Sequence, residues 1–518
     1  MRFAFRRVRQ QSFKWLAVIL CGLLISDGTR AQSIRLPWSG YAHDSQHDAA
    51  GSVPSQPLNR ILWQTPVDLN PKYTGSSLYI HYGSPLITRS NTVIVPVKTG
   101  LTGGFRVEAL AAVTGRTNWM RSTDYILPAH NWIPSFAPVL TPKNRLYFPG
   151  GGGTVYYCDT PDTTNTSPVI GQIAFYGMTN YLANTNAYLT NVFINTPITS
   201  DRYGNIFFGF LASNSAALNL QSGIARIDYN GNSTNIAASS MLTNAAITEV
   251  AMNCAPALSN DHTKLYVAVS TNYTSFGYLV ELDSRTLSPL LASVRLKDVK
   301  IPANDASLSG DGTASPTVGP DGDVYYGVLE NPHNSNNDRG WLLHFDSTLQ
   351  TNKIPGAFGW DDTASIVPAA LVPSYTGGSP YLLMTKYNNY ASVGSGNGVN
   401  KIAILDPQHS ETDSISGATV MKEVLTIAGP TPDASHTNIF PNAVREWCIN
   451  TAAVDAASKS VLANNEDGKL YRWDLTSNTF SETNTLTTGL GEAYTPTIIG
   501  VDGIVYAINN GTLFAIGR

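Results

Sequence analysis

The chain has 518 residues, of which only 14% are charged, and its formal net charge is −4 at pH 7. Its 43 glycines, 30 prolines and 25 tyrosines favour strands and turns over helices. A weakly acidic chain of this kind is a poor match for nucleic acid or anionic lipid. The sequence contains no long stretch of helical periodicity, so we expect an all-β fold.

The first 31 residues have the order of regions typical of a secretory signal peptide. Five basic residues between Arg2 and Lys14 precede an apolar run at 15–25, and Thr29-Arg30-Ala31 ends the segment. The run is too short to span a bilayer comfortably. We therefore expect cleavage after Ala31 and a periplasmic or extracellular mature chain. Cleavage removes six basic side chains and Asp27, which changes the net charge from −4 to −9.

A retained membrane anchor is the alternative interpretation of this segment. Twin-arginine export through Arg6-Arg7 is another, although Arg9 and Gln10 occupy positions where that signal has apolar residues. We expect ordinary secretion.

Residues 32–57 form a lead-in segment ahead of the first strong strand pattern. His43 and His47 lie four residues apart in it, without helical context or a matching carboxylate spacing. We expect a solvated loop here rather than a metal site. The next segment, residues 59–67 with Trp63, has the pattern of a strand.

A strand, a tight turn and a second strand are predicted between Phe105 and Trp119. Val107, Ala109 and Ala111 alternate along the first strand, and Thr114-Gly115 supplies the turn. Degraded copies of this unit begin near residues 225, 279, 342, 402 and 470. An internal repeat of this kind decides the fold.

Each repeat opens with small residues, usually ending in proline, and continues with a short apolar strand. The openings lie near residues 84, 137, 196, 255, 315, 367, 451 and 495. The longest interval, between the sixth and seventh openings, holds one repeat and an insertion at 430–442. We therefore predict one domain at 58–518, an eight-bladed β-propeller of four-stranded antiparallel blades.

The two ends of this domain are predicted to share the last blade. The final repeat stops at Arg518 before its outermost strand, whereas the strand around Trp63 has no earlier partner of its own. An N-terminal strand that completes the last blade would remove an open sheet edge.

Ala109, Ala111, Thr114, Gly115 and Trp119 resemble the signature of pyrroloquinoline-quinone (PQQ)-type repeats, with Ala111 where the family usually has aspartate. The resemblance implies an eight-bladed propeller of the quinoprotein alcohol dehydrogenase type. That family includes catalytic dehydrogenases as well as non-catalytic outer-membrane assembly lipoproteins.

The positions of the cysteines help to distinguish catalytic from non-catalytic members of this family. Dehydrogenases of the methanol type carry adjacent cysteines over the quinone, whereas Cys158, Cys254 and Cys448 are far apart in this sequence. We expect a non-catalytic member without a cofactor, with PQQ and calcium as the alternative. Three cysteines in an oxidising compartment allow at most one internal disulfide, and buried free thiols are an equal possibility.

One face of the propeller is predicted to carry short turns and the other long loops. Because binding usually resides in long loops on a rigid scaffold, we place a candidate ligand site where the central channel opens on the long-loop face. The side chains predicted there are His81, His130, Trp132, Glu249, Asp361, Asp362, Arg445, Glu446, Trp447, Glu492 and Tyr494. Such a collar could hold a cation, a sugar or a polar cofactor, or simply bind channel waters.

These features favour a monomeric, exported binding or scaffolding propeller whose ligand is a protein or a carbohydrate. A periplasmic oxidoreductase of sugars or alcohols that uses PQQ and calcium is the alternative. A third possibility is a carbohydrate-active lyase or hydrolase, with acid and base among Glu249, Glu446, Glu492 and the two histidines. The sequence contains no haem-attachment motif, nucleophile elbow or His-Glu-x-x-His motif.

Overall fold

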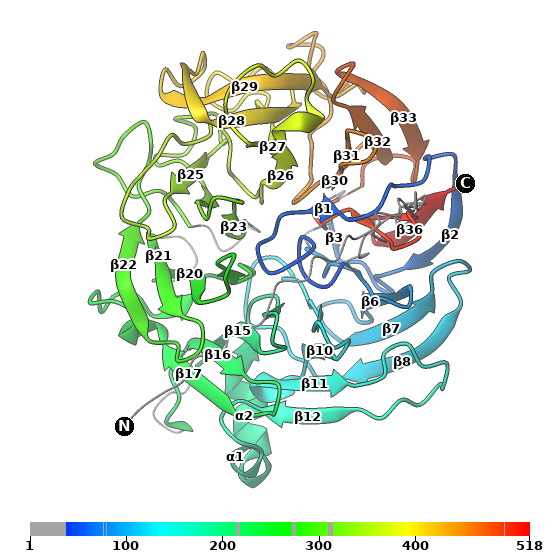
Figure 1. Cartoon of the computed structure of the whole chain (residues 1–518), viewed down its shortest axis with the longest axis vertical. Coiled ribbons are helices and arrows are strands. Elements are labelled where there is room, and N and C mark those ends of the chain that lie inside the picture. Colours follow the sequence, from blue (N-terminus) through cyan, green and yellow to red (C-terminus); the bar gives the residue numbers. More distant parts are fainter. Residues whose placement is uncertain are drawn as a thin grey trace, which may run out of the picture. The chain divides into compact units, whose positions relative to one another are not determined.

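The computed structural model describes residues 38–518 except 76, 79, 214–217, 272–275, 309–313 and 492. The predicted signal peptide and Glu492 therefore lie outside the described residues. Eight small antiparallel sheets are arranged in a ring (Figure 1). The predicted eight-bladed β-propeller is confirmed.

The strands of the first four blades are given in order from the innermost to the outermost. Blade 1 contains β5 (Leu86–Ile87), β6 (Thr92–Lys98), β7 (Phe105–Ala111) and β8 (Thr117–Thr123); blade 2 contains β9 (Val139–Leu140), β10 (Leu146–Pro149), β11 (Thr154–Cys158) and β12 (Gly171–Ala174). Blade 3 contains β14 (Thr199–Ser200), β15 (Ile206–Ala212), β16 (Gly223–Ile227) and β17 (Ser233–Ala237), with β13 (Val192–Ile194) also paired to β15. Blade 4 contains β19 (Ala257–Leu258), β20 (Lys264–Ser270), β21 (Gly277–Asp283) and β22 (Pro289–Arg295), with β18 (Glu249–Val250) also paired to β20.

The remaining blades continue around the ring. Blade 5 contains β23 (Thr317–Val318), β24 (Val324–Val328) and β25 (Trp341–Phe345), and bridges to Asn352 and Gly356 occupy its fourth position. Blade 6 contains β26 (Ser365–Pro368), β27 (Tyr381–Tyr387), β28 (Lys401–Thr412) and β29 (Thr419–Ala428); blade 7 contains β30 (Ala453–Asp455), β31 (Ser460–Asn464), β32 (Lys469–Asp474) and β33 (Thr479–Thr485). Blade 8 contains β34 (Ile498–Ile499), β35 (Val505–Asn509), β36 (Thr512–Gly517) and β2 (Arg60–Pro66).

The other elements are short. A hairpin of β3 (Tyr73–Thr74) and β4 (Ser77–Leu78) precedes blade 1, and helices α1 (Met178–Ala183) and α2 (Thr185–Asn191) connect blades 2 and 3. Single 3-10 turns lie at η1 (Gly151–Gly153), η2 (Ala238–Ser240) and η3 (Ala369–Leu371). The long interval after residue 367 holds the single blade β26 to β29 followed by the connection 429–452, as predicted.

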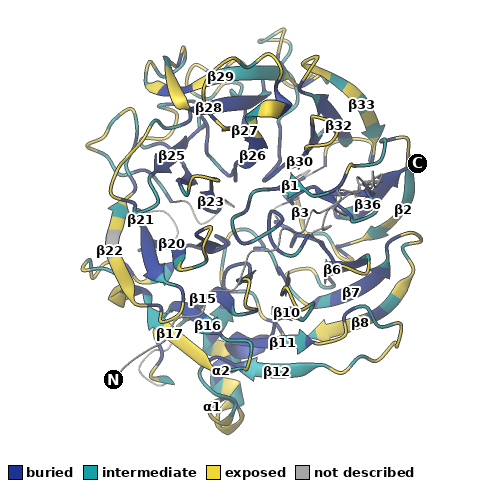
Figure 2. Cartoon of the chain, in the orientation of Figure 1, coloured by how far each residue is buried: buried dark blue, intermediate teal, exposed yellow. Residues whose placement is uncertain are grey.

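Burial follows position within each blade. Every residue of β6, with its continuous apolar run, is buried, whereas β33 alternates between exposed and half-buried residues. Figure 2 shows the same trend, with exposed residues concentrated on outer strands such as β8, β17 and β33. Inner strands are covered by neighbouring blades on both faces, so they need no polar alternation.

The two ends of the domain meet in blade 8. β2 pairs antiparallel with β36, and Trp63 lies opposite Ala515. In Figure 1 the blue β2 flanks the red β36. The predicted closure by shared terminal strands is therefore confirmed.

The lead-in segment departs from the prediction of a solvated loop. His43 is only 5% exposed and His47 only 1%, so that prediction is wrong. We call residues 38–56 the strap. The innermost strands of six blades each donate one backbone hydrogen bond to it. The donors are the N–H groups of Ile87, Leu140, Leu258, Val318, Ile366 and Val454, and the acceptors are the carbonyls of Trp38, Ser39, Ser45, Gln46, Asp48 and Ala49.

The strap lies on the short-turn face of the ring. Ile87, Leu140, Leu258 and Val318 are each the last residue of an innermost strand, directly before a short turn. Within the strap, β1 (Ala50–Gly51) pairs with β30 in parallel, at the inner edge of blade 7. The long-loop face is therefore the one left for a site at the centre of the ring.

Candidate functional site

Side chains from loops of blades 1, 2, 6, 7 and 8 meet on the long-loop face of the ring. We call this group the mouth. Its members are His81, His130, Trp132, Asp361, Lys386, Tyr390, Glu446 and Tyr494, which are linked by ring contacts and electrostatic interactions. The innermost strand of each blade begins on this face, and the second strand ends on it.

Three rings form the centre of the mouth. The His81 ring centroid lies 5.1 Å from that of Trp132 and 5.1 Å from that of Tyr494, and the latter two are 6.3 Å apart. Trp132 and Tyr494 are half-buried, whereas His81 is only 4% exposed. The two larger rings therefore separate His81 from solvent.

The imidazole of His81 is buried without hydrogen bonds. Neither of its ring nitrogens has a partner among the described residues. Burial lowers the pKa of His81 to about 4, against the opposing effect of Asp361, so the ring is neutral at pH 7. A buried polar atom without a partner costs about 1–3 kcal/mol, and a bound water, ion or ligand commonly accounts for it.

Lys386, near the end of β27, brings a positive charge to the mouth. The side chain is buried, and its Nζ lies 3.8 Å from Asp361 Oδ2, too far for a hydrogen bond. The ammonium instead faces aromatic rings, 5.4 Å from the Tyr494 centroid and 5.8 Å from that of Phe358. It has spare hydrogen-bond donors at the centre of the site.

Two carboxyl groups and a thiol occupy the blade 7 side of the mouth. The backbone N–H of Glu446 donates to Glu466 Oε1 at 3.1 Å, and the Cys448 thiol donates to Glu466 Oε2 at 3.4 Å. Burial, followed by repulsion from Glu466, raises the pKa of Glu446 to about 8. Burial also raises the pKa of Glu466. The carboxyl group of Glu446 therefore retains its proton near neutral pH.

Other predicted residues lie near the mouth but make separate contacts. Asp362 is buried with no partner for Oδ2 within the described chain, and burial raises its pKa well above the ordinary value. Arg445 pairs with Asp433 at 3.0 Å. Burial alone raises the pKa of Glu249, at the start of β18, to about 7.

Trp447 lies in the hydrophobic core. It is fully buried, and its ring contacts those of Tyr471 and Phe480 at 5.6 and 5.8 Å. It therefore stabilises blade 7 and does not contribute to the collar around the mouth. Glu492, the remaining predicted residue, is outside the described part of the chain.

Sequence reasoning missed Lys386, Tyr390, Cys448 and Glu466 as site residues. Lys386 lies near the end of a second strand, and Glu466 lies two residues beyond the end of another. The prediction names only residues ahead of innermost strands, although second strands end on the same face. A polar residue at or just beyond the end of an otherwise apolar second strand is the signal for Lys386 and Glu466.

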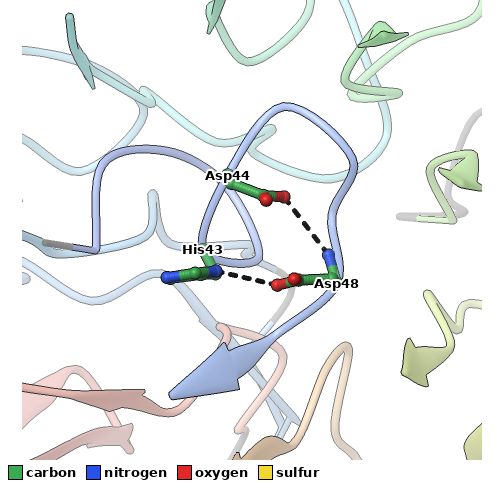
Figure 3. A group of neighbouring side chains, drawn as sticks. All are labelled: His43, Asp44 and Asp48. Atoms are coloured by element: carbon green, nitrogen blue, oxygen red, sulfur yellow. Dashed lines mark hydrogen bonds and ion pairs between the residues drawn. The ribbon is translucent and has the colours of Figure 1, made fainter. Parts of the chain in front are cut away.

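A group of possible metal ligands lies in the strap. His43, Asp44 and Asp48 have ligand atoms within 4.8 Å of one another (Figure 3). Asp44 Oδ1 accepts the backbone N–H groups of Gln46 and Asp48 at 2.9 and 3.4 Å. Asp48 Oδ1 accepts the Ala50 N–H at 2.9 Å and faces His43 Nδ1 at 2.7 Å. The strap's own donors use these oxygens, which supports a structural role.

The three cysteines of the described chain, Cys158, Cys254 and Cys448, are buried and form no disulfide bond with one another. Burial raises the pKa of Cys158, and it raises that of Cys254 to about 12. These two thiols are therefore protonated and unreactive at neutral pH. Of the two alternatives that the sequence left open, the structure favours free thiols.

Comparison with known proteins identifies the fold. No protein-family model and no curated protein matches the sequence. A europium-containing methanol dehydrogenase is similar over 91% of this chain and 88% of its own, with a TM-score of 0.55 and 9% identity. A quinohemoprotein alcohol dehydrogenase from Comamonas testosteroni matches over 94% and 82%, with a TM-score of 0.51 and 11% identity. The Dos1 propeller matches over 88% and 94%, with a TM-score of 0.50 and 10% identity.

At these identities the similarity concerns the fold alone. The chain has the same eight-bladed propeller fold as these two alcohol dehydrogenases, which is the fold that the repeat at 105–119 implied. No helix in the described parts of the chain is long and apolar enough to cross a bilayer.

Proposed function

We propose that the chain is an exported propeller that binds a small, oxygen-rich ligand, such as a sugar, at the mouth. The observation that carries this proposal is the unpartnered imidazole of His81 beneath the half-buried rings of Trp132 and Tyr494. The basic and apolar N-terminal segment supports export.

The chemistry of the mouth supports a polyhydroxylated ligand. The 3.8 Å gap between Lys386 Nζ and Asp361 Oδ2 separates a donor from an acceptor, so neighbouring hydroxyl groups could hydrogen-bond to both. The faces of Trp132 and Tyr494 offer an apolar surface for the C–H side of a sugar ring. A simple anion is less well matched because Asp361 would repel it.

Titration calorimetry with a panel of mono- and oligosaccharides tests the proposal. The variant His81→Phe keeps the ring and removes both nitrogens, and we expect it to weaken binding about tenfold or more. His409→Phe, on the outer surface of blade 6, is the matched control and should bind like the wild type. A panel without any binder, or equal affinity in both variants, would contradict the proposal.

A PQQ-dependent oxidoreductase is the second candidate, favoured by the similarity in fold to two alcohol dehydrogenases. Trp132 offers one aromatic face and Lys386 one cation for a planar, anionic quinone. The fit is incomplete, because Asp361 faces that cation and the sequence has no adjacent cysteines. Incubation with PQQ and calcium, followed by absorption spectroscopy and dye-reduction assays with alcohols and sugars, tests this candidate. Absence of both a bound chromophore and dye reduction would exclude it.

A further inference from the structure

One side chain of the strap, that of Tyr41, contacts two blades at once. The strap backbone binds the short-turn ends of innermost strands, whereas the Tyr41 ring is buried and its hydroxyl group reaches blades 6 and 7. The phenol oxygen lies 2.9 Å from Thr363 Oγ1, and the hydroxyl also donates to Asn450 Oδ1. Thr363 and Asn450 are themselves fully buried. Tyr41 therefore links the strap to the segments that precede β26 and β30.

The same two segments carry residues of the mouth. Asp361 lies two residues before Thr363, and Glu446 lies four residues before Asn450. The segments are also hydrogen-bonded to each other, since the Thr363 N–H donates to the Asn450 carbonyl at 3.0 Å and Thr451 Oγ1 donates to the Thr363 carbonyl at 3.3 Å. The hydroxyl of Tyr41 thus binds a junction that helps to set the position of one mouth carboxyl group relative to the other.

Similar hydrogen bonds extend the junction to neighbouring blades. The N–H of Ser315, ahead of blade 5, donates to Thr363 Oγ1 at 3.0 Å. A parallel bridge joins the corresponding segments of blades 7 and 8. In the next step, Thr495 Oγ1 donates at 3.1 Å to the carbonyl of Tyr82, the residue after His81. The segments ahead of the innermost strands are therefore connected from blade 5 to blade 1, beside the mouth.

We propose that Tyr41 is a positioning residue for the mouth, through which the strap on the short-turn face holds the binding side chains of the opposite face in place. Without the hydroxyl group, Thr363 Oγ1 and Asn450 Oδ1 lose a shared partner. The segments that carry Asp361 and Glu446 are then held together by fewer contacts. The inference rests on the proposed function for the ligand, whereas the positioning itself can be measured without one.

The variant Tyr41→Phe tests the proposal, because it keeps the ring and removes the hydroxyl group. Gln46→Leu is the matched control: the Gln46 side chain also binds the ring of blades from the strap, but at the carbonyls of Leu258 and Ser259 in blade 4, each at 3.1 Å. Urea unfolding should show comparable losses of stability for the two variants. For a saccharide that the wild type binds, we expect Tyr41→Phe to weaken binding about three- to tenfold and Gln46→Leu to bind like the wild type.

Amide hydrogen exchange of the ligand-free proteins measures the positioning directly. Tyr41→Phe should speed exchange in residues 359–364 and 445–451, which carry the mouth residues of blades 6 and 7. Gln46→Leu should speed exchange within the strap and near residues 257–260, and it should leave the two mouth segments unchanged.

The pH profile of stability separates positioning from a general loss of stability. Burial and Glu466 raise the pKa of Glu446 to about 8, so the wild type loses stability as the pH rises through that value. If the segment moves toward solvent in Tyr41→Phe, this variant should lose less stability between pH 4.5 and pH 9 than Gln46→Leu. The titratable and charged groups that face Glu446 are Glu466, Lys386, Tyr390, Asp433 and Arg445.

Unchanged exchange in the two mouth segments of Tyr41→Phe, parallel pH profiles of the two variants, or equal saccharide affinity in both would each overturn the proposal. A saccharide panel without any binder would contradict the proposed function instead, and the exchange and pH measurements would then decide the role of Tyr41.

Discussion

The indole ring of Trp63, on β2, packs against the backbone of Gly115, in the turn between β7 and β8. A Cβ atom added to Gly115 would lie 2.6 Å from Trp63 Cδ2, and Trp63 Nε1 donates to the Ala112 carbonyl at 2.7 Å. The last blade is thereby docked on the first. Trp119 repeats the arrangement, since its Nε1 donates to the Pro161 carbonyl of blade 2 at 2.9 Å. The glycine and tryptophan of the repeat are thus contacts between neighbouring blades.

Gly115→Ala should destabilise the propeller through this contact. Gly115 has φ +67°, so alanine incurs about 1–2 kcal/mol of backbone strain, and the clash with the indole adds about 1–3 kcal/mol. Gly417→Ala is the matched control, because Gly417 has φ +74° but no neighbouring atom within 4 Å. We expect urea unfolding to show a larger loss of stability for Gly115→Ala. Equal losses would mean that the indole gives way without cost.

The blade count and the closure were predictable because they depend on local patterns. Each blade repeats an apolar strand, a turn and a second strand, and Gly115 with Trp119 marks the docking contact. The strand around Trp63 has no earlier partner of its own, and it pairs with β36 in the last blade. Local sequence therefore contains the information for this part of the fold.

The strap could not be predicted in the same way. Its polar residues resemble a solvated loop, yet its carbonyls accept hydrogen bonds from strands as far along the chain as Val454. Ala42, His43, His47 and Ala49 all have positive φ, which is uncommon for residues other than glycine. Hydrogen bonds from six separate blades contribute to its stability, and the local sequence contains no signal for them.

The mouth was predictable in part. Residues ahead of innermost strands identified His81, Trp132 and Tyr494, which the structure brings together. Lys386 was missed because it lies within a buried, mostly apolar strand. Trp447 was predicted to lie in the collar because its sequence neighbours are polar. In an extended segment alternate side chains lie on opposite sides, and that of Trp447 lies in the core.

The ion pair between His43 and Asp48 should make the stability of the strap pH-dependent. Burial of His43 alone would lower its pKa, but the carboxylates of Asp48 and Asp44 outweigh burial and raise it to about 9 from 6.5. Protonation is therefore favoured in the folded state. The stabilisation is fully present below about pH 6.5 and disappears as the pH rises through about 9, a change of roughly 3 kcal/mol.

Asp48→Asn isolates this effect, since asparagine retains the oxygen that accepts the Ala50 N–H. The free energy of unfolding, measured by urea denaturation from pH 6 to 10, should fall more steeply with pH for the wild type than for Asp48→Asn. Parallel pH profiles for the two proteins would show that the ion pair does not contribute.

Glu446→Gln should stabilise the protein at alkaline pH. The pKa of Glu446 is raised from 4.5 to about 8 by burial and by Glu466, so the folded wild type disfavours the charged form. Its contribution to stability is present below about pH 4.5 and is lost as the pH rises through about 8. Glutamine does not titrate, and at pH 9 the variant should be more stable than the wild type by roughly 2–4 kcal/mol.

The measurement is urea unfolding at pH 4.5 and pH 9 with a chelator present, which removes any contribution from bound metal. Asp346→Asn is the control with the opposite sign. Burial of Asp346 acts to raise its pKa, but hydrogen bonds from Thr351, Thr348 and Gln350 outweigh it and lower the pKa to about 2. Loss of that carboxylate should therefore destabilise the protein at pH 9. If Glu446→Gln were no more stable than the wild type at pH 9, the carboxyl group would be solvated, and the mouth would be more open than the contacts of Glu446 and Glu466 indicate.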